Sequence, residues 1–227
     1  MLIDVFTLFP EWFGWFMRQR HVQNALRQDN DLRLFNYRDT TLLPHGQVDD
    51  TPYGGGAGMV VRVDVVDAAL QAVYGASGDE LRSARRVIVL TPGGRTFDDQ
   101  LANELAGLEA VTLLCGRYEG IDERVREHLA SDAVSIGRYV LSGGELAAMV
   151  VADAVFRKLP GALGSEESVV EESFSTALGG GPEYPHYTRP ASYRGWDVPE
   201  VLLSGDHERV RRWRLARSAA RGRASTR

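Results

Sequence analysis

Four glycine-rich stretches have the composition and spacing of ligand-binding loops. They occupy residues 50–58, 90–94, 115–122 and 135–145, and three of them follow short apolar runs typical of buried strands. At the carboxyl ends of parallel strands, glycines let bare backbone N–H and C=O groups approach a ligand. One such loop alone is more often a tight turn, but the four together predict a ligand site.

The basic residues and the glycine spacing exclude several kinds of ligand. Lys158 is the only lysine among 26 basic residues, and its neighbours do not match a P-loop, a pyridoxal phosphate site or a kinase. Met59 stands where a Gly-x-Gly-x-x-Gly dinucleotide motif starting at Gly54 would need glycine. A ligand held mainly by backbone groups, such as an adenosyl group with an amino-acid tail, suits these loops. The residues alone do not select it.

Disulfide and zinc chemistry are disfavoured. Cys115 is the only cysteine, which forbids an intrachain disulfide and indicates a reducing compartment. The five histidines are scattered without the spacing of a zinc site. The start of the sequence carries Asp4 where a signal peptide has basic residues, and no apolar run reaches the roughly 18 residues of a membrane helix. We therefore expect a cytoplasmic protein.

The charge is divided unevenly along the chain. The formal net charge of -5 argues at first against a nucleic-acid partner. All 31 acids, however, lie within residues 1–208, whereas residues 209–227 carry eight arginines and no acid. The basic segment is typical either of a solvated helix end or of a local RNA contact.

Strand-like and helix-like patterns alternate along the first two thirds of the chain. The patterns predict strands at 2–8, 32–37, 87–90 and 111–115, and helices at 11–27, 63–74, 97–105, 122–128 and 145–159. This alternation predicts an α/β fold in which helices cover both faces of a largely parallel sheet.

A change of composition predicts the domain organisation. Residues 163–181 are rich in Gly, Ser and Glu, which predicts a flexible linker between a domain at 1–162 and a small helical domain at 182–227. A helix is expected at 206–220, with Asp206 as its N-cap.

Five motifs carry a resemblance to a known family. They are Tyr-Gly-Gly-Gly-Ala-Gly-Met at 53–59, Cys-Gly-Arg-Tyr-Glu-Gly-Ile-Asp at 115–122, Tyr-Val-Leu-Ser-Gly-Gly-Glu at 139–145, Tyr-Thr-Arg-Pro at 187–190 and Val-Leu-Leu-Ser-Gly-Asp-His at 201–207. The chain resembles the bacterial tRNA (guanine-N1)-methyltransferases, the TrmD family of the SPOUT class. The resemblance implies methyl transfer from S-adenosylmethionine to N1 of guanosine-37 beside the tRNA anticodon. It also implies a trefoil-knotted domain, a homodimer with its active site at the interface, and a C-terminal tRNA-binding domain.

The resemblance also assigns site residues. Its catalytic arginine corresponds to Arg157, and its catalytic aspartate corresponds to Glu183, four residues before Tyr187. The cofactor contacts correspond to Leu90, Thr91, Pro92, Gly94, Gly116, Ile136, Gly137, Arg138, Tyr139, Val140, Leu141, Gly143 and Gly144. No metal site is expected, and a need for magnesium stays open.

The chemistry of guanine N1 explains the two catalytic assignments. N1 carries a proton and is a poor nucleophile until that proton leaves, so methylation needs a general base near N1 and a cation near O6. Glu183 and Arg157 supply these two groups. A target base in an anticodon loop is already partly unstacked, which lowers the cost of exposing it.

Three departures from the family pattern keep other functions open. Arg138 replaces the usual aspartate, Glu183 replaces the catalytic aspartate, and the C-terminal domain is expected to be shortened. The alternatives are another SPOUT-class RNA methyltransferase, acting on ribosomal RNA or a ribose 2′-hydroxyl, and a catalytically weak RNA-binding relative.

Overall fold

The computed structural model describes residues 1–163 and 172–225. The chain divides into two compact units, Met1–Gly164 and Ser165–Arg227. Part of the predicted linker, residues 164–171, lies outside the described residues. Within the described ranges, no helix combines the length and the apolar character needed to cross a bilayer.

A five-stranded parallel sheet forms the centre of the first unit. Its strands lie in the order β2-β1-β6-β5-β7, and every neighbouring pair is parallel. The strand bounds are β1 Leu2–Thr7, β2 Asp31–Asn36, β5 Arg86–Thr96, β6 Ala110–Cys115 and β7 Asp132–Ser135, and a separate antiparallel pair consists of β3 Asp49–Asp50 and β4 Val60–Val61. The predicted parallel α/β sheet is confirmed.

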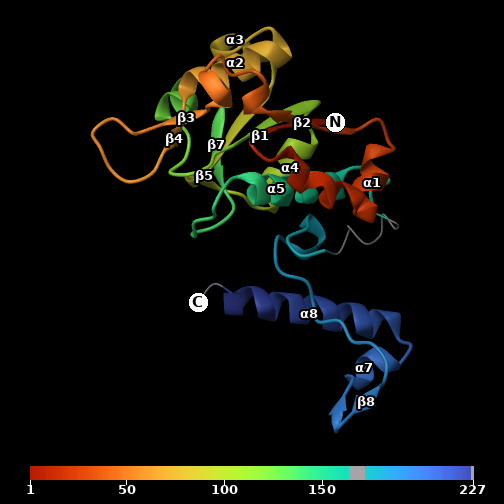
Figure 1. Cartoon of the computed structure of the whole chain (residues 1–227). Helices are drawn as coiled ribbons and strands as arrows, with labels where there is room; N and C mark the ends of the chain where they lie inside the picture. Colours follow the sequence, from red (N-terminus) through yellow and green to blue (C-terminus); the bar gives the residue numbers. More distant parts are fainter. Residues whose placement is uncertain (164–171, 226–227) are drawn as a thin grey trace. The chain divides into compact units, whose positions relative to one another are not determined.

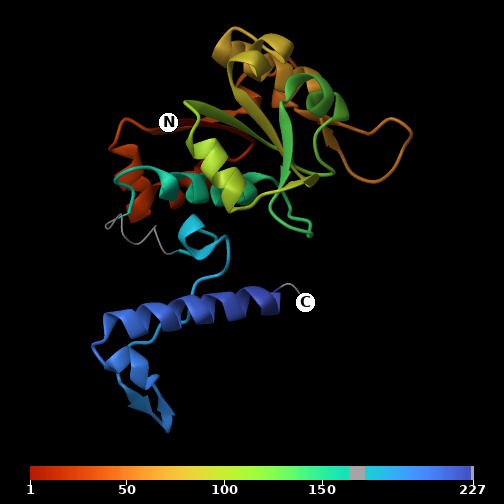
Figure 2. The same cartoon turned by 180° about the vertical axis from the view of Figure 1, so that it is seen from behind.

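Helices cover both faces of this sheet (Figures 1 and 2). On one face, α1 Arg20–Leu26, α4 Asp99–Ala106 and α5 Glu145–Lys158 pack into the first hydrophobic cluster. On the other face, α2 Val63–Tyr74, α3 Gly78–Ala84 and the π-helical turn η5 Val125–Leu129 pack into the second cluster. The short 3-10 helices of this unit are η1 Pro10–Gly14, η2 Phe16–Arg18, η3 Tyr37–Asp39 and η4 Pro44–Gly46.

The predicted helix at 11–27 is wrong as a continuous element. The segment forms η1, η2 and α1, with extended backbone at Gln19 between η2 and α1. Phe13 and Phe16 are both buried. Phe13 belongs to η1 and Phe16 to η2, and both rings pack into the first hydrophobic cluster.

Strand β5 is much longer than the predicted strand at 87–90. It continues to Thr96, and its register against β7 shifts between Leu90 and Arg95. A Cβ on Gly94 would lie 2.4 Å from the backbone nitrogen of Val134. Glycine at this position therefore lets the second half of β5 pass directly against β7, and the 90–94 stretch lies inside the strand.

The second unit consists of short elements and one long helix. Its elements are η6 Thr176–Leu178, the antiparallel pair β8 Ser192–Tyr193 and β9 Trp196–Asp197, α7 Glu200–Leu203 and α8 His207–Ser225. The backbone N–H of Arg209 donates a hydrogen bond of 3.0 Å to Asp206 Oδ1, which confirms Asp206 as the N-cap of α8. The β8–β9 hairpin was not expected in a small helical domain.

Candidate functional site

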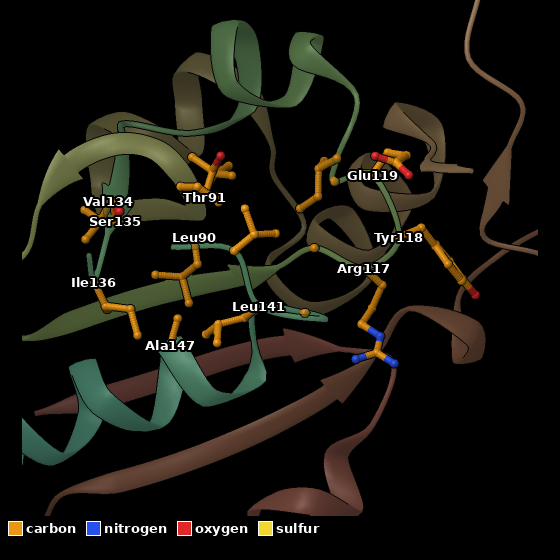
Figure 3. Close-up of a pocket in the computed structure, with 18 of the residues that line it drawn as sticks. Leu90, Thr91, Arg117, Tyr118, Glu119, Val134, Ser135, Ile136, Leu141 and Ala147 are labelled. Atoms are coloured by element: carbon orange, nitrogen blue, oxygen red, sulfur yellow. The ribbon is translucent and has the colours of Figure 1, made fainter. Parts of the chain in front are cut away.

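A cavity lies at the carboxyl ends of β6 and β7 and against the middle of β5, at residues 89–92. Its volume is about 430 Å³, within the range of small-ligand sites. Figure 3 shows its apolar part, where Leu90, Ile136, Leu141 and Ala147 lie close together. The loops after β6 and β7 provide most of the wall, as expected for an open parallel sheet.

Most of the predicted cofactor residues line this cavity. Eleven of the thirteen do so: Leu90, Thr91, Pro92, Gly116, Ile136, Gly137, Tyr139, Val140, Leu141, Gly143 and Gly144. A hydrogen bond of 2.9 Å from the Gly144 N–H to the Gly116 carbonyl joins two of the lining loops. The tertiary structure thus brings together residues that are separated by more than 50 positions in the sequence.

The other two predicted contacts, and one of the glycine loops, lie elsewhere. Gly94 lines a second, smaller concavity with Arg95 and Asp132, and Arg138 is exposed outside the first cavity. The loop at 50–58 does not line the cavity either. It carries Tyr53, which is 99% exposed, and extends away from the sheet (Figure 1).

Three carboxylates that the sequence did not single out give the cavity an acidic side. Glu119, Asp122 and Glu123 line it together with Arg117 and Arg126, of which Arg126 donates to Glu123 Oε1 at 3.0 Å. Hydrogen bonds from Arg124, which donates from Nε at 2.9 Å and from a terminal nitrogen at 2.7 Å, lower the pKa of Asp122 below its usual value. These carboxylates suit a ligand that carries positive charge, such as the sulfonium and ammonium groups of S-adenosylmethionine, while the apolar side suits an adenosyl group.

The buried cysteine beside the cavity is not a reactive nucleophile. Cys115 is fully buried, and burial raises the pKa of its thiol well above the usual value, which keeps it protonated and unreactive. Within residues 1–163 and 172–225, no three or more His, Cys, Asp or Glu side chains are grouped to hold a metal ion.

The two predicted catalytic residues belong to different units. Arg157 lies in the last turn of α5 in the first unit and is partly buried. In the second unit, the Glu183 carboxylate is 31% exposed, and its Oε1 lies 2.6 Å from Nε2 of His186.

Helix α8 holds the backbone around Glu183. Ser218 Oγ donates a hydrogen bond of 2.8 Å to the Pro182 carbonyl, and Arg221 donates one of 3.0 Å to the Glu183 carbonyl. No local pattern predicts these contacts, because the residues are more than 35 positions apart.

Hydrogen bonds connect the segment next to Glu172 with the segment that contains Glu183. Phe174 N–H donates to the Gly181 carbonyl at 2.8 Å, and Glu183 N–H donates to Ser173 Oγ at 2.9 Å. These bonds pair residues 173–174 with residues 181–183, and Glu172 directly precedes Ser173. Glu172 is therefore a second candidate for the general base, which the sequence interpretation did not consider.

The fold and the cavity define a class: an α/β protein with a cavity of small-ligand size, lined mainly by loops at the carboxyl edge of a parallel sheet. A family profile described as tRNA (Guanine-1)-methyltransferase TrmD matches residues 1–227. The chain belongs to this family.

Relatives with known names support the same family. A tRNA (guanine-N(1)-)-methyltransferase of Brevibacillus brevis is 51% identical over 225 residues, which cover 99% of this chain and 89% of the relative. Proteins with the same name from Dehalococcoides mccartyi and Bacillus cereus are 50% and 47% identical, each over 222 residues. They cover 97% of this chain, and 87% and 88% of the respective relatives.

Proposed function

We propose that the protein transfers a methyl group from S-adenosylmethionine to N1 of guanosine-37 in tRNA, in the cytoplasm. The observation that carries this proposal is that eleven residues assigned to cofactor binding line one cavity in a chain of the TrmD family. The donor supplies an electrophilic methyl group when bound. The cavity's backbone groups and apolar side hold it, and the carboxylates of the acidic side complement its positive charge.

The protein's own residues then act on the guanine. Glu183 accepts the proton that leaves N1, and Arg157 stabilises the negative charge that develops at O6. The contacts of Ser218 and Arg221 with the Pro182–Glu183 backbone support this role, because a general base must be held in a defined position.

The active form is a homodimer with its active site at the interface. Exposed apolar side chains support this part of the proposal: Trp15 is 52% exposed, and Leu146 and Val150 of α5 are 49% and 45% exposed. Leu146 and Val150 lie four residues apart on one face of α5, and η1 packs against the same helix. An apolar face of this kind is typical of a surface that a partner covers. We also propose that the first unit has the trefoil knot of the family.

The anticodon stem-loop is bound by the second unit. Arg209, Arg211 and Arg217 of α8 are exposed, and the same unit exposes aromatic rings at Tyr193 and Trp196. Arginine and aromatic side chains together are suited to phosphates and to unpaired bases.

A methylation assay on tRNA transcripts that differ only at position 37 tests the proposal. With labelled S-adenosylmethionine, we expect methyl incorporation into the transcript with guanosine-37 and none into the transcript with adenosine-37. Mass spectrometry of the digested product should show 1-methylguanosine. A methylated ribose, or methylation that ignores position 37, would favour the other RNA methyltransferase. Binding of donor and tRNA without transfer would favour the catalytically weak relative.

A further inference from the structure

A buried carboxylate lies directly behind the wall of the cavity. Glu145, the first residue of α5, is 1% exposed. Its Oε1 accepts a hydrogen bond of 2.9 Å from the Thr7 hydroxyl. Its Oε2 has no hydrogen-bond partner among the described residues. A buried carboxylate oxygen without a hydrogen bond is costly unless an opposite charge compensates it.

The compensating charge belongs to Arg117. One terminal nitrogen of its guanidinium lies 3.8 Å from Glu145 Oε2, and in the described part of the chain this nitrogen also has no hydrogen bond. The guanidinium lies over the rings of Phe9 and Trp12, 4.6 and 5.3 Å from their centroids. In Figure 3 the side chain of Arg117 extends away from Leu90 and Leu141. Arg117 therefore lines the cavity, while its charge lies behind the wall.

The backbone of Arg117 connects two lining loops. It forms antiparallel bridges with Gly120 in its own loop and with Gly143 in the loop before α5. A Cβ on Gly143 would lie 2.4 Å from Arg117 Cδ and 2.4 Å from Glu145 Oε2. The Arg117–Glu145 pair thus lies against the backbone of Gly143, at the point where the two loops meet.

We infer that Glu145 is a positioning residue for binding of the methyl donor. Through Arg117 it fixes the separation between the 115–122 loop and the turn at Gly143 and Gly144, which form two walls of the cavity. Glu145 does not itself line the cavity. The inference rests on the proposed function, because the donor is the ligand for which the separation matters. Hydrogen bonds from backbone groups weaken steeply with distance and angle, and a backbone wall has no side-chain freedom to compensate for a shift.

Isothermal titration of the full-length protein with S-adenosylmethionine tests this role. Glu145→Gln keeps the shape and the acceptor for Thr7 but removes the charge that faces Arg117. We expect the Kd for the donor to rise about tenfold, since a buried charge loses its partner. The KM for the donor should rise similarly, whereas kcat at saturating donor and the Kd for tRNA should change less than twofold. Glu109→Gln, on the surface after α4, is the matched control and should bind the donor like the wild type.

A double variant shows whether Glu145 acts through Arg117. Glu145→Gln combined with Arg117→Gln should bind the donor no more weakly than the weaker single variant, because both changes break one interaction. Additive losses would overturn the inference.

Gly143→Ala gives a second route if Glu145→Gln does not fold. The added methyl group should separate Arg117 from Glu145 and weaken donor binding, whereas Gly107→Ala adds a methyl group only in ordinary contact with its neighbours. Wild-type donor affinity in Gly143→Ala would overturn the inference.

Two further outcomes separate the inference from the proposed function. Wild-type donor affinity in Glu145→Gln, with a lowered Tm of the ligand-free protein, would show a purely structural role and overturn the inference alone. If the wild-type protein bound no S-adenosylmethionine, the proposed function and the inference would both be wrong.

Discussion

The two units of the chain bury their side chains to very different extents. The first unit packs apolar residues into a cluster on each face of its sheet. In the described part of the second unit, only Tyr184 and Ser218 are buried, and Trp196 and Leu203 are 70% and 60% exposed. The first unit therefore has a core that stabilises it and shapes the cavity. The second unit displays aromatic and basic side chains, which are suited to binding a partner.

The largest expected effect is on kcat, through the general base that is assigned to the second unit. Glu183→Gln should lower kcat by roughly 10²–10⁴, because it removes the general base. The Kd for S-adenosylmethionine should stay unchanged, since the cavity belongs to the first unit. Single-turnover methylation at saturating donor and tRNA measures the effect, and Glu208→Gln, on the surface of α8, is the control. If Glu172→Gln lowered kcat strongly and Glu183→Gln did not, the general base would be Glu172 instead.

A pair of core and surface substitutions tests the difference in packing. Phe156 is fully buried in the first cluster, so Phe156→Ala should lower the free energy of unfolding by about 3–5 kcal/mol. Leu215 of α8 is 45% exposed. Leu215→Ala should therefore change the free energy of unfolding by less than about 0.5 kcal/mol. Urea denaturation followed by circular dichroism compares the two variants. An equal loss in Leu215→Ala would show that the second unit buries this side chain in solution.

Charge substitutions in each unit test which one contacts RNA. Replacing Arg209 and Arg211 of α8 by glutamine should weaken tRNA binding and reduce the slope of log K against log salt by about 1.5, since each lost phosphate contact contributes roughly 0.7–0.9. The same change at Arg20 and Arg27, which are exposed in α1 and just after it, should leave the slope nearly unchanged. If the slope of log K against log salt were equal in the two double variants, α8 would have no special role in contacting RNA.

The smallest expected effect is a change in the pKa of Asp122, at the rim of the cavity, and in the pH dependence of the Tm. Arg124→Gln should raise the pKa of Asp122 towards its usual value, because it removes the hydrogen bonds that lower it. A carboxylate whose folded-state pKa is lowered stabilises the fold above its unfolded pKa, near 4, and loses that contribution as the pH falls through the folded value. The Tm difference between the wild type and Arg124→Gln should therefore be present at pH 7 and shrink below pH 4. NMR titration of the Asp122 carboxyl group checks the pKa. Arg126→Gln, which removes a contact to Glu123 instead, is the control.

Local patterns predicted much of the first unit. The helix at 63–74 agrees with α2 at both ends, and the strands at 2–8 and 111–115 agree with β1 and β6 to within one residue. These elements have the apolar periodicity of their own secondary structure, so neighbouring residues contain the information. The glycine loops at 115–122 and 135–145, which the sequence predicts at a ligand site, line the cavity.

Other elements depended on contacts that the local sequence does not contain. The sequence interpretation did not predict α3, β7 or the β8–β9 hairpin, and β5 extends past its glycines only because Gly94 lies against β7. The resemblance assigns Gly94 to the cofactor contacts, and in the structure its missing side chain permits β5 to pack against β7.

The sequence by itself determined the alternation of strands and helices, the family, the glycine loops and the basic segment, because periodicity, composition and motifs are local properties. Only the tertiary structure brought eleven distant residues to one cavity, paired the segment at Glu172 with that at Glu183, and buried Glu145 against Arg117. These arrangements depend on distances between residues far apart in the chain, which packing of the sheet and its helices sets.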